Sequence, residues 1–484
     1  MNAVQEAKRF VGAGQFVDAL KALNAGQIER PDRTESEVLR AELLERIGQH
    51  AISRERAEDL LRSRKLTAGE RSACNLILAR ADTVDGRFDS AIAHLQRAVS
   101  VAQTTGDYER ACWAQLRLLV LLSEHSGSDA VVSLLAELRT NATRTGNPVI
   151  VAALHVFVAQ VEAKRSLISS ARRHLRIALG ILQRSPNAWL EAMAKQIETA
   201  IAIMRAEFQL ALKHASAGVE LAERSGAAHV CATSHGNLSN VLFLTGDYNN
   251  AVRHQERAFQ GFPPRSDSRI ATLDSLVRIR LAQKRLDDCD DLLGQIDDLL
   301  AISENRTRYV YRHALLTRVD AWSRGGRVQD ALAEVDTAIH LAETSGDGLL
   351  FHVATLTKAE LLANTARVVE AIRVIEHVSL TVGLQPPDVY ALYERVLACA
   401  LWKENNKTAA SSHIARAKRI YEALHHSPGL VDLESSWARA TEADPPLGEQ
   451  RDDAIFPDRS SANSAIHSLT ALVIHGGRLE FVAR

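Results

Sequence analysis

Five histidines stand at equivalent places along the chain, and imidazole is the side chain best suited to bind a metal or to titrate near neutral pH. Each histidine follows an alanine by three residues: His94, His174, His214, His254 and His413. Such a ladder could hold metal ions or respond to pH, or it could be a position copied by duplication. Geometry favours duplication, because packed helices lie about 8–10 Å apart while zinc ligands lie about 2.0–2.1 Å from one ion. We therefore predict no metal site.

Other residue types that carry chemistry give no catalytic pattern. The sequence contains no GxxxxGK[ST] or GxGxxG phosphate loop, no GxSxG elbow, no HExxH pair and no CxxC pair. An acidic run at residues 287–291 is interpreted as a solvated helix face, with a docking patch for basic residues as the alternative. We therefore expect no catalytic residues, no cofactor and no enzyme activity.

The five cysteines are widely separated along the chain: Cys74, Cys112, Cys231, Cys289 and Cys399. An odd number of isolated cysteines inside helical patterns is typical of reduced core thiols in a cytoplasmic protein. The amino terminus lacks an apolar signal core, and no run approaches the roughly 20 apolar residues of a membrane span. The sequence thus predicts a cytoplasmic protein that does not enter a membrane.

A six-residue phrase returns about every forty residues and must position everything else. Its clear copies are GQFVDA at residues 14–19, GRFDSA at 86–91, AEFQLA at 206–211, GDYNNA at 246–251 and GRVQDA at 326–331. Weaker copies end at Ala171, Cys289, Ala371 and Ala410. A fixed period of this size indicates stacked repeats.

The residues after each phrase follow a helical period. Ala91, Leu95 and Ala98 show the order small, bulky, small, which lets a neighbouring helix approach closely. Fifteen residues after the repeated alanine, or after Val131 where it fills that position, a glycine or proline ends the helix: Gly106, Gly146, Pro186, Gly226, Gly346 and Pro386. A second helix of about 17 residues then precedes the next phrase, so each unit is predicted to be an antiparallel helix hairpin.

This pattern resembles the tetratricopeptide repeat (TPR) family in its longer variety. Ala91, Leu95 and Ala98 match the family's small-bulky-small spacing, and Ala251 and Ala258 repeat it with the polar Gln255 between them. The resemblance implies an all-α superhelix of about eleven hairpins, which we assign to residues 1–435. It also implies that partners bind in a concave groove.

In the TPR family the inner wall of that groove comes from the first helix of each unit, 18, 15, 11 and 7 residues before the repeated small residue. Carried onto this sequence, the resemblance gives a binding wall of ten residues: Trp113, Gln160, Lys164, Gln196, Asn240, His313, Asp320, Arg324, Glu360 and Asn364. Such side chains pair well with backbone amides and carboxylates. We expect a protein, a peptide or a small signalling ligand to bind there, although any solvated helix face is also polar.

The repeat pattern fades towards the carboxyl end. Residues 436–463 are polar, charged and proline-containing, which predicts a linker, and residues 464–484 predict a short apolar helix. Residues 472–480, LVIHGGRLE, resemble the linker after the TPR-like region of bacterial sigma-54-dependent transcriptional regulators. The helix is therefore either the start of a missing domain or a cap on the array.

The charge balance bears on the partner. Lys and Arg total 58 and Asp and Glu total 59, which argues against direct nucleic-acid contact. Two functions remain: a non-enzymatic regulatory binding module at the front of a bacterial transcriptional regulator, or a self-contained scaffold for assembling a protein complex. A homodimer is compatible with either function.

Overall fold

The computed structural model describes residues 2–442 except 27, 29–31, 63–65, 126–127, 165–166, 265 and 303–308. Over these residues the chain is helical, with twenty-three α-helices and no strand. The helices pack in antiparallel pairs joined by short turns, from α1 and α2 to α21 and α22. The predicted all-α array of eleven hairpins is confirmed, with α23 following the last pair.

The first helices of the hairpins carry odd numbers. They are α1 (Ala3–Gly12), α3 (Arg33–Arg46), α5 (Ala68–Val84), α7 (Tyr108–His125), α9 (Pro148–Lys164), α11 (Ala188–Met204), α13 (Ala228–Leu244), α15 (Asp267–Ala282), α17 (Tyr309–Arg324), α19 (Gly348–Asn364), α21 (Pro387–Lys403) and α23 (Ser427–Thr441).

The second helices carry even numbers. They are α2 (Phe16–Ala25), α4 (His50–Arg62), α6 (Phe88–Thr104), α8 (Ser128–Thr145), α10 (Ile168–Leu182), α12 (Phe208–Ser225), α14 (Tyr248–Gly261), α16 (Leu286–Ile302), α18 (Val328–Ser345), α20 (Val368–Ser379) and α22 (Lys407–Leu424). A short 3₁₀ helix, η2 (Val382–Leu384), separates α20 from α21.

The repeated alanines form the contact stripe of the second helices. Those at 91, 171, 211, 251, 331, 371 and 410 are all fully buried. Leu95 and Ala98 on α6 are buried beside Ala91, so the small-bulky-small order faces the partner helix as predicted. A larger side chain at the alanine would push the two helices of a hairpin apart.

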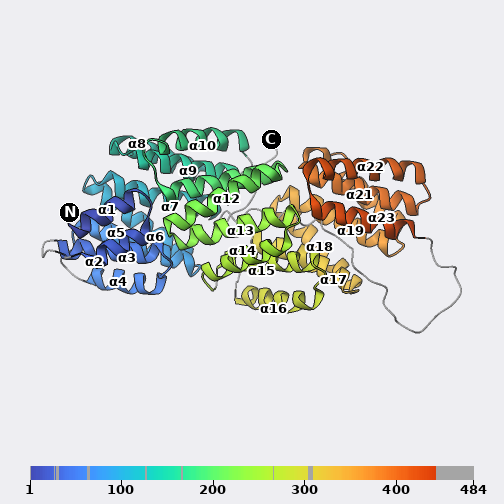
Figure 1. Ribbon diagram of the computed structural model, residues 1–484, viewed down its shortest axis with the longest axis horizontal. Coiled ribbons are helices and arrows are strands. Elements are labelled where there is room, and N and C mark those ends of the chain that lie inside the picture. The colour runs from blue at the N-terminus through green and yellow to red at the C-terminus, as the bar shows by residue number, and fades with distance from the viewer. Residues whose placement is uncertain are drawn as a thin grey trace.

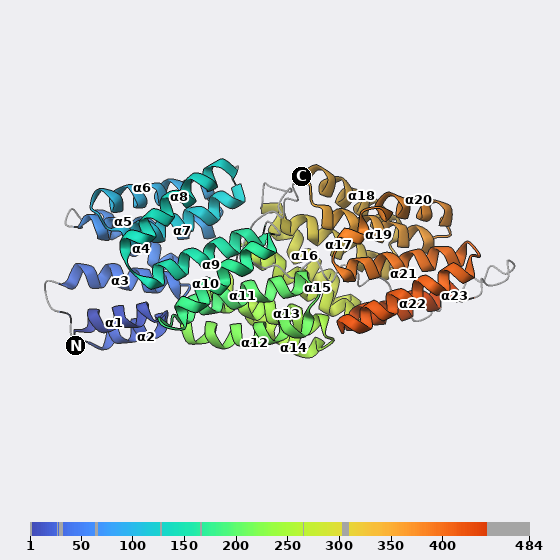
Figure 2. The same ribbon diagram turned by 90° about the horizontal axis from the view of Figure 1, so that it is seen from above.

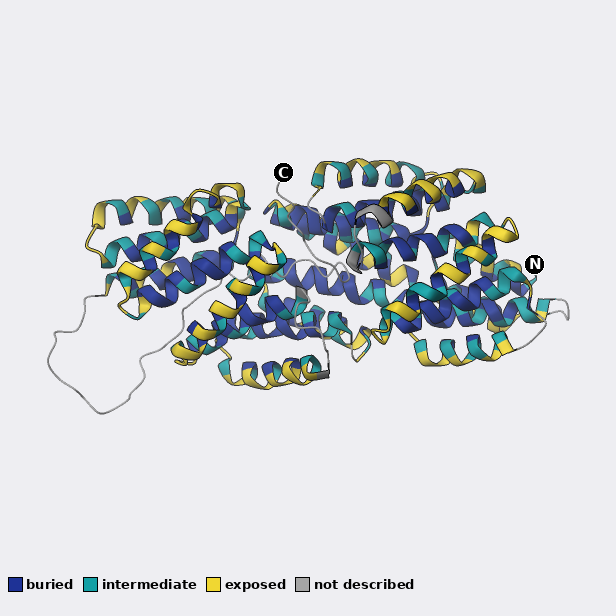
Figure 3. Ribbon diagram, turned by 180° about the vertical axis from the view of Figure 1, so that it is seen from behind, coloured by how far each residue is buried: buried dark blue, intermediate teal, exposed yellow. Residues whose placement is uncertain are grey.

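The two sets of helices differ in burial. On α13 the buried residues lie on every side of the helix, whereas on α14 they are confined to Ala251, Val252, Gln255 and Ala258. Figure 3 shows the same contrast along the chain, with exposed residues concentrated on the outer, even-numbered helices. The odd-numbered helices are therefore the inner layer of the array.

Contacts between distant hairpins reveal how tightly the array winds. The Ala188 amide at the start of α11 donates to the Ala13 carbonyl after α1, at 3.0 Å. The Ser427 hydroxyl at the start of α23 donates to the Thr245 carbonyl after α13, also at 3.0 Å. Both pairs join helices whose numbers differ by ten (α1 to α11, α13 to α23), so one superhelical turn takes five hairpins. The result is an elongated molecule (Figures 1 and 2).

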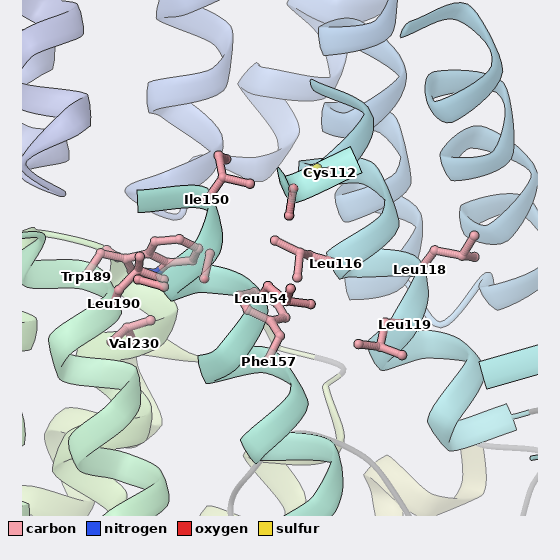
Figure 4. Close-up of a cluster of buried hydrophobic side chains, with 14 of the residues drawn as sticks. Cys112, Leu116, Leu118, Leu119, Ile150, Leu154, Phe157, Trp189, Leu190 and Val230 are labelled. Atoms are coloured by element: carbon pink, nitrogen blue, oxygen red, sulfur yellow. The ribbon is translucent and has the colours of Figure 1, made fainter. Parts of the chain in front are cut away.

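The largest apolar core joins the two ends of the first superhelical turn. Phe16 of α2 packs edge-on against Trp189 of α11, with ring centroids 6.0 Å apart. Phe157 of α9 lies on the same tryptophan, with centroids 6.3 Å apart. Figure 4 shows Trp189, Leu190 and Val230 beside the side chains of α7 and α9. The first hairpin is thus stabilised by a residue 173 positions away in sequence.

The carboxyl end differs in part from the sequence interpretation. Helix α23 runs to Thr441, so the boundary predicted at residue 435 falls inside a helix and residues 436–441 are helical. The rest of the predicted linker and the predicted apolar helix at 464–484 lie outside the described residues. Within the described part of the chain, no helix is both long and apolar enough to cross a membrane.

Candidate binding surface on the inner helices

All ten residues of the predicted binding wall lie on odd-numbered, inner helices. Trp113 is on α7, Gln196 on α11 and Asn364 on α19; the first two are half-buried and the third is exposed. The other seven are buried: Gln160, Lys164, Asn240, His313, Asp320, Arg324 and Glu360. The five-hairpin turn encloses these side chains between helices, so most of them do not face open solvent.

Two of the predicted residues form a buried ion pair on α17. The Arg324 guanidinium donates to both carboxylate oxygens of Asp320, at 2.8 and 3.2 Å, and also to the Leu281 carbonyl of α15 at 3.3 Å. Burial raises the pKa of Asp320 to about 7 even though Arg324 opposes the shift. The four-residue spacing within one helix makes this bidentate geometry possible.

A second buried ion pair links α19 and α21 to α23. Arg395 donates to the Glu360 carboxylate at 2.9 Å and to the Ser436 hydroxyl at 2.9 Å. Ser436 in turn donates to the other Glu360 oxygen at 3.0 Å. These three groups hydrogen-bond to one another in a closed triangle, which orients α23 on the inner face of the array.

The charge of Asp432 on α23 acts on both ion pairs, since it helps to raise the pKa of Asp320 and that of Arg395. Asp432 is buried, and its charge also contributes to raising the pKa of Tyr248 on α14. For Tyr248 burial is the larger cause, and together they raise its pKa to about 12. We call Asp320, Arg324, Glu360, Arg395, Asp432 and Ser436 the inner polar network.

Two other predicted residues have partners outside this network. Trp113 lies against Trp189, with ring centroids 5.7 Å apart, in the first superhelical turn. Gln196 donates to the Val230 carbonyl and to the Ser234 hydroxyl, both at 2.9 Å, which joins α11 to α13. Of the predicted wall, Asp320, Arg324 and Glu360 therefore belong to the inner polar network, whereas Trp113 and Gln196 contact other groups.

His313 is a special case among the predicted residues. Its Nε2 atom lies 3.7 Å from the Asp347 carboxylate, which also pairs with Arg312 at 3.1 Å. Asp347 caps α19 by accepting from the Leu350 amide at 3.2 Å. His313 thus contributes to the packing of α17 against the start of α19.

The repeated histidines contact their own hairpins and do not form a ladder. His174 lies 2.6 Å from His155, and His254 lies 2.9 Å from His235, measured between Nδ1 atoms. At the same repeat position His413 lies 2.6 Å from the Glu394 carboxylate. No group of three or more metal-binding side chains occurs among the described residues.

The cysteines offer no activated nucleophile. Burial raises the pKa of the Cys74, Cys112, Cys289 and Cys399 thiols to about 12, and that of Cys231 to about 11. All five thiols are therefore protonated at neutral pH, and a protonated thiol is a poor nucleophile and metal ligand.

The sequence analysis did not list three residues of the inner polar network, and one of them stands at a position that the repeat spacing predicts. Arg395 stands 15 residues before Ala410, within the spacing that defined the wall. Asp432 and Ser436 follow the last repeated alanine, so the spacing has no reference point for them. The contacts of α23 with the network are seen in the structure, and the repeat spacing does not predict them.

Comparison with known proteins identifies no relative by sequence: neither a protein-family model nor a curated protein matches the chain. Among solved structures, the chain resembles the one described as the crystal structure of a Rap protein complexed with competence and sporulation factor. The sequences are 12% identical, the TM-score is 0.37, and the alignment covers 87% of this chain and 97% of the other. Since that TM-score is low, the assignment of a helical-repeat fold rests on the hairpin contacts described above.

Proposed function

We propose that the chain is a non-enzymatic binding module that receives a protein, a peptide or a small signalling ligand on its inner helices. The observation that carries the proposal is the inner polar network, which places paired charges on helices that could have packed through apolar side chains alone. Buried ion pairs contribute little net stability, so their presence favours a role in specific recognition. The network already holds one helical segment, α23, through polar side chains.

The finer proposal concerns the biological setting. We propose that the module is the sensory front part of a bacterial transcriptional regulator in the cytoplasm, which passes a binding signal to an output domain. Support comes from the resemblance of residues 472–480 to a regulator linker. A self-contained scaffold that assembles a protein complex is the rival, and a second copy of the chain is a candidate partner for either.

Site-specific photo-cross-linking tests the location of binding. A benzophenone amino acid would replace Gln196 or Asn364 on inner helices, and Gln209 on the outer helix α12 would serve as the exposed control. Cross-linking in a lysate of the source organism, followed by mass spectrometry, should identify the same partner from both inner positions and not from Gln209. Equal labelling from all three positions would contradict binding at the inner helices.

Limited proteolysis separates the regulator from the scaffold. Rapid cleavage after Thr441, with the array left intact, is expected if the following residues link to an output domain. Protection of residues 464–484 together with the array would support the scaffold, because a docked cap shields its backbone from proteases.

A further inference from the structure

Three arginines from successive inner helices converge on one carboxylate near the amino end of the array. The Glu45 carboxylate of α3 lies 3.8 Å from Arg46 Nε, 3.2 Å from Arg80 Nε of α5 and 3.4 Å from Arg117 Nη2 of α7. We call Arg46, Arg80 and Arg117 the arginine cluster. Its members belong to the inner layer, the side of the array on which a ligand would be enclosed.

The arginine cluster carries more positive charge than its surroundings neutralise. Among the described residues, Glu45 is the one carboxylate within 4 Å of the cluster, so three positive charges meet one negative charge. Nearby Glu42 pairs with Arg110 at 3.3 Å, and Asp85 pairs with Arg54 at 3.0 Å and with Arg87 at 2.7 Å. These carboxylates are engaged by arginines of their own.

The surplus charge also shifts the titration of the groups involved. Burial would raise the pKa of Glu45, but the charges of Arg117, Arg46 and Arg80 outweigh it and lower the pKa to about 2. Burial and the neighbouring Arg117 charge lower the pKa of Arg46 to about 10. Burial and the Arg80 charge lower the pKa of His50, whose Nδ1 atom is buried without a hydrogen-bond partner.

The cluster is held in place and still reaches solvent. The Arg46 guanidinium lies 4.4 Å from the centroid of the Trp189 ring and 5.2 Å from that of Phe16, which fixes its plane. The side chains of Arg46, Arg80 and Arg117 remain 23%, 20% and 21% exposed. Each guanidinium has about five N–H donors, far more than the two Glu45 oxygens can accept.

We propose that the arginine cluster is a binding site for a small oxyanion, a carboxylate or a phosphate group. Preoriented guanidinium groups with unused donors and a surplus of positive charge bind such anions in bidentate fashion. Glu45 aligns the arginines and competes with the incoming anion. This site is independent of the proposed partner binding, because it takes a small anion whether or not a protein docks elsewhere on the inner helices.

The test is calorimetric titration of the full chain with inorganic phosphate and with acetate, at constant ionic strength maintained by sodium chloride. Saturable binding of at least one of these anions is expected, together with a change in tryptophan fluorescence from Trp189 beside Arg46. Saturation by acetate alone identifies a carboxylate ligand, and saturation by phosphate alone a phosphate ligand. Absence of saturable binding by both would overturn the proposal.

Variants distinguish a binding role from a structural one. Arg80→Met should weaken anion binding by about tenfold or more, because a charged hydrogen bond is lost. The charge-preserving Arg80→Lys should also weaken it, because an ammonium group cannot form the bidentate contact of a guanidinium. Arg318→Met is the matched control, since Arg318 is also on an inner helix and 14% exposed but pairs with two carboxylates, Asp297 and Glu334. An equal loss of affinity in the Arg318 variant would refute the assignment.

Glu45→Gln tests whether the Glu45 carboxylate competes with a bound anion. Removal of the competing carboxylate should strengthen anion binding and lower the melting temperature in chloride buffer, with phosphate or acetate restoring it. A purely structural role of Glu45 predicts the lower melting temperature without rescue by either anion, and that result would contradict the site.

Discussion

The repeated histidine position places two imidazoles in contact in two hairpins that are 80 residues apart. His155 with His174, and His235 with His254, each share one hydrogen bond between Nδ1 atoms. Such a bond needs one protonated and one unprotonated Nδ1, so at most one ring of a pair can carry a positive charge. Protonation of both rings would remove the acceptor and place two positive charges side by side.

These pairs predict that the protein loses stability in mild acid. Burial, and then the charge of the partner histidine, lower the pKa of His155 and of His235 to about 4. In the unfolded chain the pKa is about 6.5, so the unfolded state binds more protons below that value. Stability should be full above about pH 6.5 and fall by roughly 1–2 kcal/mol per histidine between pH 7 and pH 5. Urea unfolding across this range measures it.

Replacement of one member tests the origin of the acid sensitivity. His235→Gln keeps a hydrogen-bonding group opposite His254 but cannot be protonated, so the loss of stability between pH 7 and pH 5 should become smaller. The exposed His377 of α20, changed to Gln, controls for the loss of one histidine. An unchanged pH dependence in the His235 variant would show that other groups cause the sensitivity.

At the scale of the helix and its termini, glycines at the ends of outer helices have two separate effects, one on the backbone conformation and one on packing against another helix. Gly146 and Gly226 both have a left-handed backbone, with φ of 62° and 66°. A Cβ atom at Gly146 would meet no other residue within 4 Å, whereas at Gly226 it would lie 2.4 Å from Val17 Cγ2 of α2. The two positions therefore share backbone strain and differ in a contact between superhelical turns.

Alanine substitutions at Gly146 and Gly226 separate the cost of backbone strain from the cost of this contact. Gly146→Ala should cost about 1–2 kcal/mol from the left-handed conformation alone. Gly226→Ala should cost more than that, because the methyl group must also displace α2. Chemical unfolding of both variants gives the difference directly, and equal losses would mean that α2 yields without cost.

The buried ion pair between α19 and α21 predicts strong coupling. Glu360→Gln should destabilise the protein by about 3–5 kcal/mol, because the buried Arg395 loses the carboxylate to which it donates. Arg395→Met should cost a similar amount, and the double variant much less than the sum. A double-mutant cycle from urea unfolding measures the coupling, and additive losses would rule out the pairing.

The sequence predicted the hairpins because their signals are local. Ala91, Leu95 and Ala98 define a contact stripe within one helix, and Gly226 ends another through its own backbone preference. The ion pair of Asp320 with Arg324 is also local, four residues apart on one helix. The Glu360–Arg395–Ser436 triangle spans 76 residues, and no local pattern specifies it.

At the scale of the whole molecule, contact between successive turns departs from the behaviour of a simple repeat array. In such arrays each unit contacts only its neighbours. Here α2 packs on α11, and α13 contacts α23, so distant hairpins stabilise one another. The winding depends on small rotations summed over five hairpins, which is why the sequence predicted the inner helices but not how far they are enclosed.

This arrangement predicts long-range effects of a single core substitution. Phe16→Ala should remove about 3–5 kcal/mol of local stability and speed hydrogen exchange both in α2 and in α11, where Trp189 loses its neighbour. Ile296→Ala, in the local core of α15 to α17, is the control, and its effect should stay within those helices. Hydrogen exchange with mass spectrometry measures the effect of both variants on each helix. An effect of Phe16→Ala confined to α1 and α2 would contradict the coupling.

The five-hairpin turn also has a mechanical consequence. A loosely wound helical array extends under tension like a soft spring, because its coils do not touch. Here the coils are joined by the Ala188–Ala13 and Ser427–Thr245 hydrogen bonds and by the packing of Phe16 on Trp189. When the molecule is pulled from its ends, it should first resist extension as a stiff rod. It should lengthen elastically only after these contacts between coils have broken.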